Sequence, residues 1–198
     1  MNKSYYSLGL MSGTSGDGVD ASLAISDGKN KFDIIYNEYV QYPPDVYEEF
    51  HKLKEKILNL EDIEKYSKKL KDIERKITIC NSTAVETIKF KLSQQKSGIK
   101  IDLVGFHGQT IYHNPGDGHS RQLGNGNLLS KSTKKKVIYD FRTNDLKNSG
   151  QGAPLTPIFH KLLAEQNKLN NPVTILNIGG IANVTDIDKD FKISSMDI

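Results

Sequence analysis

One pattern of strands and glycine turns occurs twice in this chain and limits the folds open to it. The first copy is "YYSLGLMSGTSGDGVDASLAI" from Tyr5, and a third strand, "KFDIIYNEYVQY", follows it and stops at Pro43. The second copy is "VTILNIGGIANVTDI" from Val173, followed by "FKISSMDI". Strands joined by short turns form antiparallel meanders. The repeat therefore predicts two domains of similar architecture.

The segment after the first meander has the apolar spacing of helices. Val46, Phe50 and Leu53 begin a stripe that reaches Leu60, and after a restart at Asn59 a second stripe runs to Leu92. Asn59 is a typical N-cap residue. A coiled coil would have the same spacing. We favour helices packed on a sheet, because the flanking strands need a covering layer.

Further elements follow this helical region. "IDLVGFHG" and "KVIYDF" predict buried strands. "PLTPIFHKLLAEQNK" predicts a helix with Ile158, Leu162 and Leu163 facing inward. The second copy of the strand pattern has no helices after it, unlike the first. We therefore predict one domain at residues 1–168 and the opening part of a second, similar domain at residues 169–198.

Composition narrows the class of protein. The single cysteine, Cys80, excludes an intramolecular disulfide and is typical of a reducing cytoplasm. No apolar run approaches the ~20 residues that a membrane span needs, so no membrane association is expected. The net charge of +3 is spread along the 198 residues and gives no indication of a nucleic-acid partner.

The glycine-rich stretch "GTSGDGVD", Gly13 to Asp20, matches neither familiar strand-to-helix phosphate motif. No lysine follows its glycines, and the segment after it alternates like a strand. A hairpin tip of this kind can direct backbone N–H groups toward an anion. Asp17 and Asp20 supply the oxygen ligands that Mg²⁺ prefers. The alternative is a glycine-rich turn with no ligand.

Three more clusters combine glycine with polar side chains: "GFHGQTIYHNP", "RQLGNGNLL" and "YDFRTNDLKNSGQGAPL". Amide and hydroxyl groups match the hydroxyls of a sugar, and glycine allows the backbone to approach a ligand closely. Together the clusters predict a site for a polar ligand of sugar size.

These motifs, in this order, resemble those of the anhydro-N-acetylmuramic acid kinases, and the resemblance runs from residue 9 to residue 185. It implies an α/β fold of the ribonuclease-H-like, actin-like ATPase class, with a mixed sheet, flanking helices and ATP between two domains. It also implies a cytoplasmic enzyme that uses ATP and Mg²⁺ to open 1,6-anhydro-N-acetylmuramic acid with water and phosphorylate O6, in cell-wall recycling. A homodimer is implied for the full-length protein.

The same resemblance implies roles for individual residues, in three groups. The ATP phosphates would be bound by Gly13, Thr14, Ser15, Gly16, Asp17, Gly18, Val19 and Asp20, with Gly179 and Gly180 from the second domain. The sugar would be contacted by His107, Gln109, Gln122, Asp140, Arg142 and Gln151. Asp197 would be the general base, and Asp17 and Asp20 would hold Mg²⁺.

The chain departs from this family's pattern at several positions. Gly16 stands where a bulkier residue is usual, which predicts a looser loop, and the family's sequence continues well beyond the position of Ile198. We therefore expect these 198 residues to be inactive alone. The alternatives are a related kinase with another sugar substrate, and a non-catalytic fragment that binds nucleotide or sugar.

Overall fold

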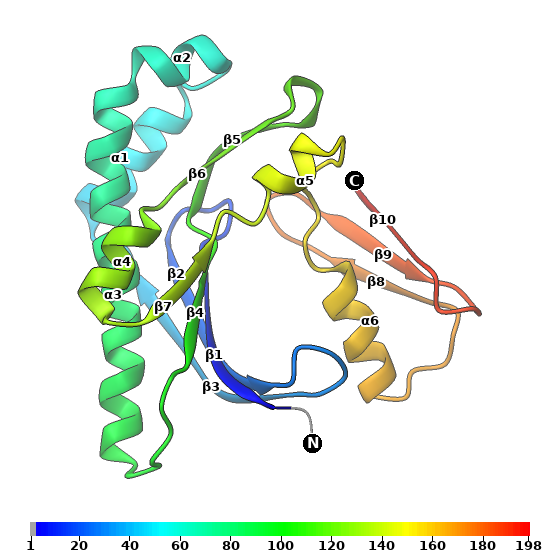
Figure 1. Cartoon of the computed structure of the whole chain (residues 1–198). Helices are drawn as coiled ribbons and strands as arrows, with labels where there is room; N and C mark the ends of the chain where they lie inside the picture. The colour runs from blue at the N-terminus through cyan, green and yellow to red at the C-terminus, as the bar shows by residue number, and fades with distance from the viewer. Residues whose placement is uncertain (1–2) are drawn as a thin grey trace.

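A computed structural model describes residues 3–198, and its centre is a five-stranded sheet (Figure 1). The strand order is β3-β2-β1-β4-β7. The bounds are β1 Tyr5–Met11, β2 Gly18–Ser26, β3 Phe32–Gln41, β4 Leu103–Phe106 and β7 Lys136–Tyr139. β1, β2 and β3 form the predicted antiparallel meander, whereas β4 and β7 run parallel to β1. This mixed sheet with flanking helices confirms the predicted fold class.

Three helices follow β3, and two of them cover one face of the sheet. The bounds are α1 Pro44–Lys54, α2 Leu60–Lys65 and α3 Ser67–Gln94. Phe50 of α1 and Ile73 and Ile77 of α3 are fully buried against Leu8 and Val104 of the sheet. The predicted stripes therefore form the core. Within residues 3–198, no helix combines the length and apolar character needed to cross a membrane.

The predicted restart of the helix at Asn59 is confirmed, but the first helix is shorter than expected. α1 ends at Lys54, and Ile57 is buried from the connecting turn instead. Asn59 accepts a hydrogen bond from the N–H of Asp62 at 3.0 Å, which caps α2. Leu60, which was assigned to the apolar stripe, is 41% exposed.

The polar clusters fold into small elements at one end of the sheet. Their bounds are β5 Gln109–Asn114, η1 Pro115–Asp117, β6 His119–Leu123, α4 Gly126–Thr133 and α5 Thr143–Lys147. β5 and β6 form a separate antiparallel hairpin. The sequence did not predict these elements, because glycine and polar residues obscure their periodicity.

β7 corrects one prediction. "KVIYDF" was expected to form a buried strand, but β7 is an edge strand, and Ile138 and Tyr139 are 52% and 44% exposed. Only Val137 packs against the core. Successive residues of a strand point to opposite faces, so Ile138 and Tyr139 are exposed on both sides of this edge strand.

The last part of the chain forms a helix and a second sheet, of three strands. The bounds are α6 Pro157–Gln166, β8 Val173–Asn177, β9 Asn183–Ile187 and β10 Ile193–Asp197. Ile158 was expected to face inward but is 80% exposed, a wrong prediction. α6 packs against β9 and β10 through His160 and Ala164 instead, and His160 Nδ1 lies 2.8 Å from Thr185 Oγ1.

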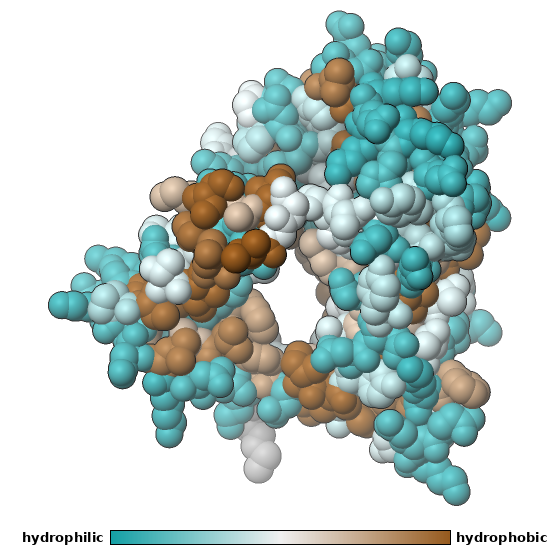
Figure 2. All heavy atoms as spheres, turned by 180° about the vertical axis from the view of Figure 1, so that it is seen from behind, coloured by the Kyte–Doolittle hydropathy of each residue, from teal (hydrophilic) through white to brown (hydrophobic). Residues whose placement is uncertain are grey.

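The proposed division of the chain at residues 168 and 169 stays a prediction, and it includes two residues, 1 and 2, that lie outside the described part. α6, which that division assigns to the first domain, packs against the second sheet. Its Phe159 ring also lies 4.9 Å from the ring of Phe32 at the start of β3. Figure 2 shows apolar side chains around an opening between the two parts.

Candidate functional site

Three of the predicted clusters meet because each follows one of three neighbouring parallel strands. Gly13 comes after β1, His107 after β4 and Asp140 after β7, and these three strands are neighbours in the sheet. Open α/β sheets bind ligands outside the carboxyl ends of their strands. The candidate site lies at this edge.

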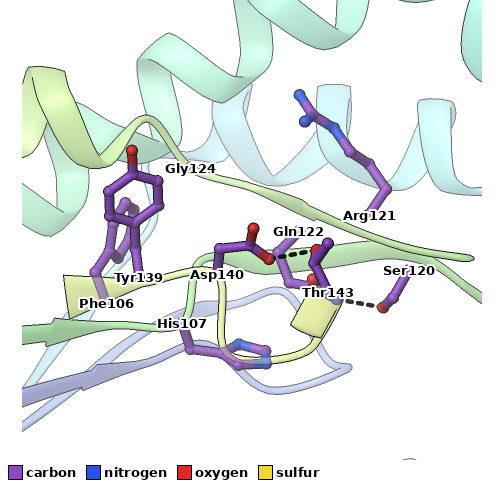
Figure 3. Close-up of a pocket in the computed structure, with 9 residues that line it drawn as sticks. All are labelled: Phe106, His107, Ser120, Arg121, Gln122, Gly124, Tyr139, Asp140 and Thr143. Carbon is purple, nitrogen blue, oxygen red and sulfur yellow. Dashed lines mark hydrogen bonds between the residues drawn. The ribbon is translucent and has the colours of Figure 1, made fainter. Parts of the chain in front are cut away.

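A pocket of about 160 Å³ lies beside the end of β4 (Figure 3). It is lined by Phe106, His107, Ser120, Arg121, Gln122, Gly124, Tyr139, Asp140 and Thr143. Three of these, His107, Gln122 and Asp140, were predicted sugar contacts. Ser120, Arg121, Tyr139 and Thr143 were not selected, although all four lie inside or beside the clusters quoted from the sequence.

Hydrogen bonds hold the polar side chains of this pocket in place. Gln122 Nε2 lies 2.7 Å from Ser120 Oγ and 3.2 Å from Thr110 Oγ1. Thr143 Oγ1 donates to Asp140 Oδ1 at 2.5 Å, and Asp140 has a left-handed backbone with φ +62°. Strained backbone of this kind is concentrated at functional sites. The pocket therefore presents amide, hydroxyl and carboxylate groups in fixed positions.

His107 and Arg142 connect the pocket to the glycine loop after α5. His107 Nδ1 donates to the carbonyl of Gly108 at 2.8 Å, so its Nε2 accepts from Arg142, whose Nη2 lies 2.8 Å away. Arg142 Nη1 also donates to the carbonyl of Gly152 at 2.6 Å. Burial, and then the charge of Arg142, lower the pKa of His107 to about 4. His107 is therefore neutral at neutral pH and acts as an acceptor that orients Arg142.

Gln151 lies in that glycine loop, exposed and outside the pocket lining. The loop is held by Asp145, whose Oδ2 accepts from the N–H of Gly152 at 2.7 Å. A side chain at Gly150 would start 2.2 Å from the same carboxylate. Asp145 lies in a polar cluster quoted from the sequence but was not selected as a site residue.

The glycine hairpin between β1 and β2 is anchored by its carbonyl groups. Three side chains donate to three successive carbonyls: Gln109 Nε2 to Gly13 at 2.7 Å, Lys54 Nζ to Thr14 at 2.8 Å, and His51 Nε2 to Ser15 at 2.8 Å. Among the described residues, the N–H groups of Thr14 and Ser15 form no hydrogen bond. The hairpin thus has free donors for an anion. His51 and Lys54 carry no motif and were missed.

The remaining predicted residues of this hairpin have distinct environments. Val19 is fully buried in the core, so only its backbone can face a ligand. Asp17 and Asp20 are exposed, and Ser15 Oγ donates to Asp17 Oδ1 at 2.6 Å. That hydrogen bond lowers the pKa of Asp17. Desolvation, and then the charge of Asp17, raise the pKa of Asp20.

Magnesium binding by Asp17 and Asp20 stays a prediction. Within residues 3–198, no three His, Cys, Asp or Glu side chains gather around one point. Mg²⁺ commonly binds to one or two carboxylates and takes its other ligands from water and substrate phosphates.

The second glycine turn touches the first. A Cβ on Gly180 would lie 2.1 Å from Thr14 Oγ1, so Gly180 packs directly against Thr14. At Gly179 the nearest atom to such a Cβ is the carbonyl oxygen of Ile181, at 3.5 Å. The two predicted phosphate turns, 166 positions apart in the sequence at Thr14 and Gly180, are therefore in contact.

Asp197 ends β10 and its side chain is exposed. Its charge acts on two groups of the site. Burial lowers the pKa of Arg142, and Asp197 opposes that shift. Burial and the charge of Arg142 lower the pKa of His113, and Asp197 opposes this shift as well. The carboxylate of the second sheet is thus within electrostatic reach of Arg142 and His113.

Comparison with known proteins identifies one family. The family model for anhydro-N-acetylmuramic acid kinase matches residues 5–198. A relative of that name from Pelagibacter ubique (strain HTCC1062) is 50% identical over 186 residues, 93% of this chain and 48% of the relative. Relatives of the same name from Gluconobacter oxydans (strain 621H) and Rhizobium etli are 40% and 36% identical, over 47% and 51% of their lengths. The chain spans about half the length of the curated relatives it matches.

Proposed function

Because this chain belongs to the anhydro-N-acetylmuramic acid kinase family, we propose that it carries the phosphate loop and the sugar pocket of an ATP-dependent sugar kinase. The proposed substrate is 1,6-anhydro-N-acetylmuramic acid and the product is N-acetylmuramic acid 6-phosphate, formed in the cytoplasm during cell-wall recycling. The full-length protein is proposed to be a homodimer that needs neither nucleic acid nor membrane.

The observation that supports this proposal is the contact between Thr14 and Gly180, which joins the two glycine turns. Backbone N–H groups of both turns are proposed to bind the ATP phosphates, as turns of this kind can bind anions. His107, Gln122 and Asp140, which line the polar pocket, are proposed to bind sugar hydroxyls. Arg142 and Gln151 are proposed to contact the sugar from the neighbouring glycine loop.

In the proposed reaction a water molecule gives its proton to the Asp197 carboxylate while its oxygen attacks C1 of the sugar. The bond from C1 to the bridging O6 breaks, and O6 attacks the γ-phosphorus of ATP, whose bond to the β,γ-bridging oxygen breaks so that ADP leaves. Asp17 and Asp20 are proposed to hold Mg²⁺, which when bound neutralises phosphate charge. The charge of Asp197 in turn acts on Arg142, where it opposes the lowering of the pKa by burial.

Asp197→Asn in the full-length protein tests this assignment. The change removes the proton acceptor but keeps the shape, so we expect kcat to fall about 10²–10⁴-fold. The KM values for ATP and sugar should change little. The matched control is Asp186→Asn, which alters a carboxylate on the neighbouring strand β9 and should keep full activity. Product formed in ¹⁸O-labelled water should carry the label at C1 and not in the phosphate.

Two outcomes would contradict the proposal. Phosphorylation of N-acetylglucosamine in preference to the anhydro sugar would indicate a related kinase with another substrate. Binding of ATP or sugar by a folded full-length protein that forms no product would indicate a non-catalytic protein.

A further inference from the structure

Gln109 of β5 faces away from the pocket that residues of the paired strand β6 line. In the β5–β6 hairpin Thr110 is opposite Gln122, and Gln109 is opposite Leu123. Gln122 lines the pocket and donates to Thr110. Successive residues of a strand point to opposite sides. The fully buried Gln109 side chain accordingly reaches the glycine hairpin, where Nε2 donates to the carbonyl of Gly13.

Packing alone does not account for an amide at this position. Gln109 Oε1 is buried and has no hydrogen-bond partner within the described residues. A buried acceptor without a donor is unfavourable, and an apolar side chain of similar size would avoid it. Gly13, in contrast, is partly exposed, so water could hydrate its carbonyl if the amide were absent. The amide is thus less favourable for stability than an apolar side chain would be, while it fixes the position of the hairpin.

The origin of the three carbonyl anchors gives Gln109 a special place. Lys54 and His51 both belong to α1. Gln109 alone of the three belongs to the hairpin that carries part of the sugar pocket. We infer that Gln109 is a positioning residue, rather than a sugar contact, which sets the distance between the phosphate loop and the sugar pocket. This inference rests on the function proposed above.

The test is Gln109→Met in the full-length protein, assayed for kcat and for both KM values, with the melting temperature measured alongside. A misplacement of about 1 Å between reacting groups can lower a rate about 10²-fold. We expect kcat to fall about 10–100-fold and the KM for ATP to rise several-fold, with the KM for sugar within about twofold. The melting temperature should stay equal or rise. Gln109→Glu keeps the shape and removes the N–H donor, and should show the same kinetic loss.

The matched control is Thr133→Val on α4. Thr133 is equally buried and donates to the carbonyl of Leu129 at 2.7 Å, but lies on a helix that carries no pocket residue. Loss of this hydrogen bond should lower the melting temperature and leave kcat and both KM values unchanged. An inactive wild-type protein would contradict the proposed function itself. An active wild type would overturn the inference alone if Gln109→Met kept its kinetics, or if it raised only the KM for sugar.

Discussion

At the scale of single residues, Gly16 shows how the glycine hairpin between β1 and β2 obtains its shape. Its φ of +59° lies in the left-handed region, and a Cβ there would come within 2.4 Å of the Phe50 ring. The departure from the bulkier family residue was expected to loosen the loop. In this structure the fully buried Phe50 occupies the space beside Gly16, and the N–H of Gly16 donates to the carbonyl of Gly13 at 3.1 Å.

Gly16→Ala should therefore destabilise the protein through two effects, the positive φ and the clash with Phe50. The matched control is Gly28→Ala, since Gly28 has a φ of +71° and nothing within 4 Å of an added Cβ. We expect Gly28→Ala to cost about 1 kcal/mol in the free energy of unfolding, and Gly16→Ala about 2–4 kcal/mol. Urea unfolding measures both. Equal losses would show that Phe50 yields to the new methyl group.

At the scale of elements, two asparagine caps of similar geometry serve different purposes. Asn59 Oδ1 accepts from Asp62 N at 3.0 Å at the start of α2, and Asn125 Oδ1 accepts from Leu128 N at 2.8 Å at the start of α4. Of the two caps, only Asn125 is next to a pocket residue, because Gly124, which precedes it in the chain, lines the pocket. Its own N–H donates to Thr78 Oγ1 at 3.0 Å, so α3 fixes where α4 begins.

We expect Asn59→Ala and Asn125→Ala each to lower the free energy of unfolding by about 1 kcal/mol, the usual value of an N-cap. Sugar binding should separate them. Asn125→Ala should weaken the affinity several-fold because the backbone beside Gln122 loses its support, while Asn59→Ala leaves it unchanged. Calorimetric titration of the full-length variants with the anhydro sugar measures this difference. Equal sugar affinities in the two variants would show that the cap of α4 does not influence sugar binding.

At the scale of the whole molecule, the two sheets are linked near both ends of the first meander. The Thr14–Gly180 contact joins the glycine turns, and Gln166 of α6 donates to the carbonyl of Phe32 at 2.9 Å. Apolar side chains remain accessible on the second part, Ile178 among them at 80% exposure (Figure 2). The relative placement of the sheets therefore depends on a few contacts.

Gly180→Ala should disturb this placement, because its methyl group would meet Thr14 Oγ1 at 2.1 Å. Separation of the glycine turns should raise the dissociation constant for ATP about tenfold or more in the full-length protein. Gly179→Ala is the control, since its methyl group would find only an ordinary contact at 3.5 Å. Fluorescence titration with a labelled nucleotide compares the two. Equal affinities would mean that the turns need not touch for ATP to bind.

The site could be anticipated in part, because strand ends are visible in a sequence. His107, Gln122 and Asp140 were selected for their glycine-rich surroundings after strands, and all three line one pocket. His51 and Lys54 could not be found, because they lie on a charged helix whose pattern resembles any solvated surface. Their hydrogen bonds to the carbonyls of Ser15 and Thr14 depend on where the fold places α1 beside the glycine hairpin.

The sequence by itself determined the strands outside the β5–β6 hairpin, the two glycine turns, the apolar faces of α1 and α3, and the family. Period-2 and period-3.6 patterns and turn residues are local features, so they can be recognised in the sequence without knowledge of the fold. Only the tertiary structure decided that Ile158 faces outward, that β7 is an edge strand, and that Gln109 reaches Gly13 rather than the pocket. The face of an element that becomes buried depends on which neighbour packs against it, and that neighbour is brought there by the fold of distant segments.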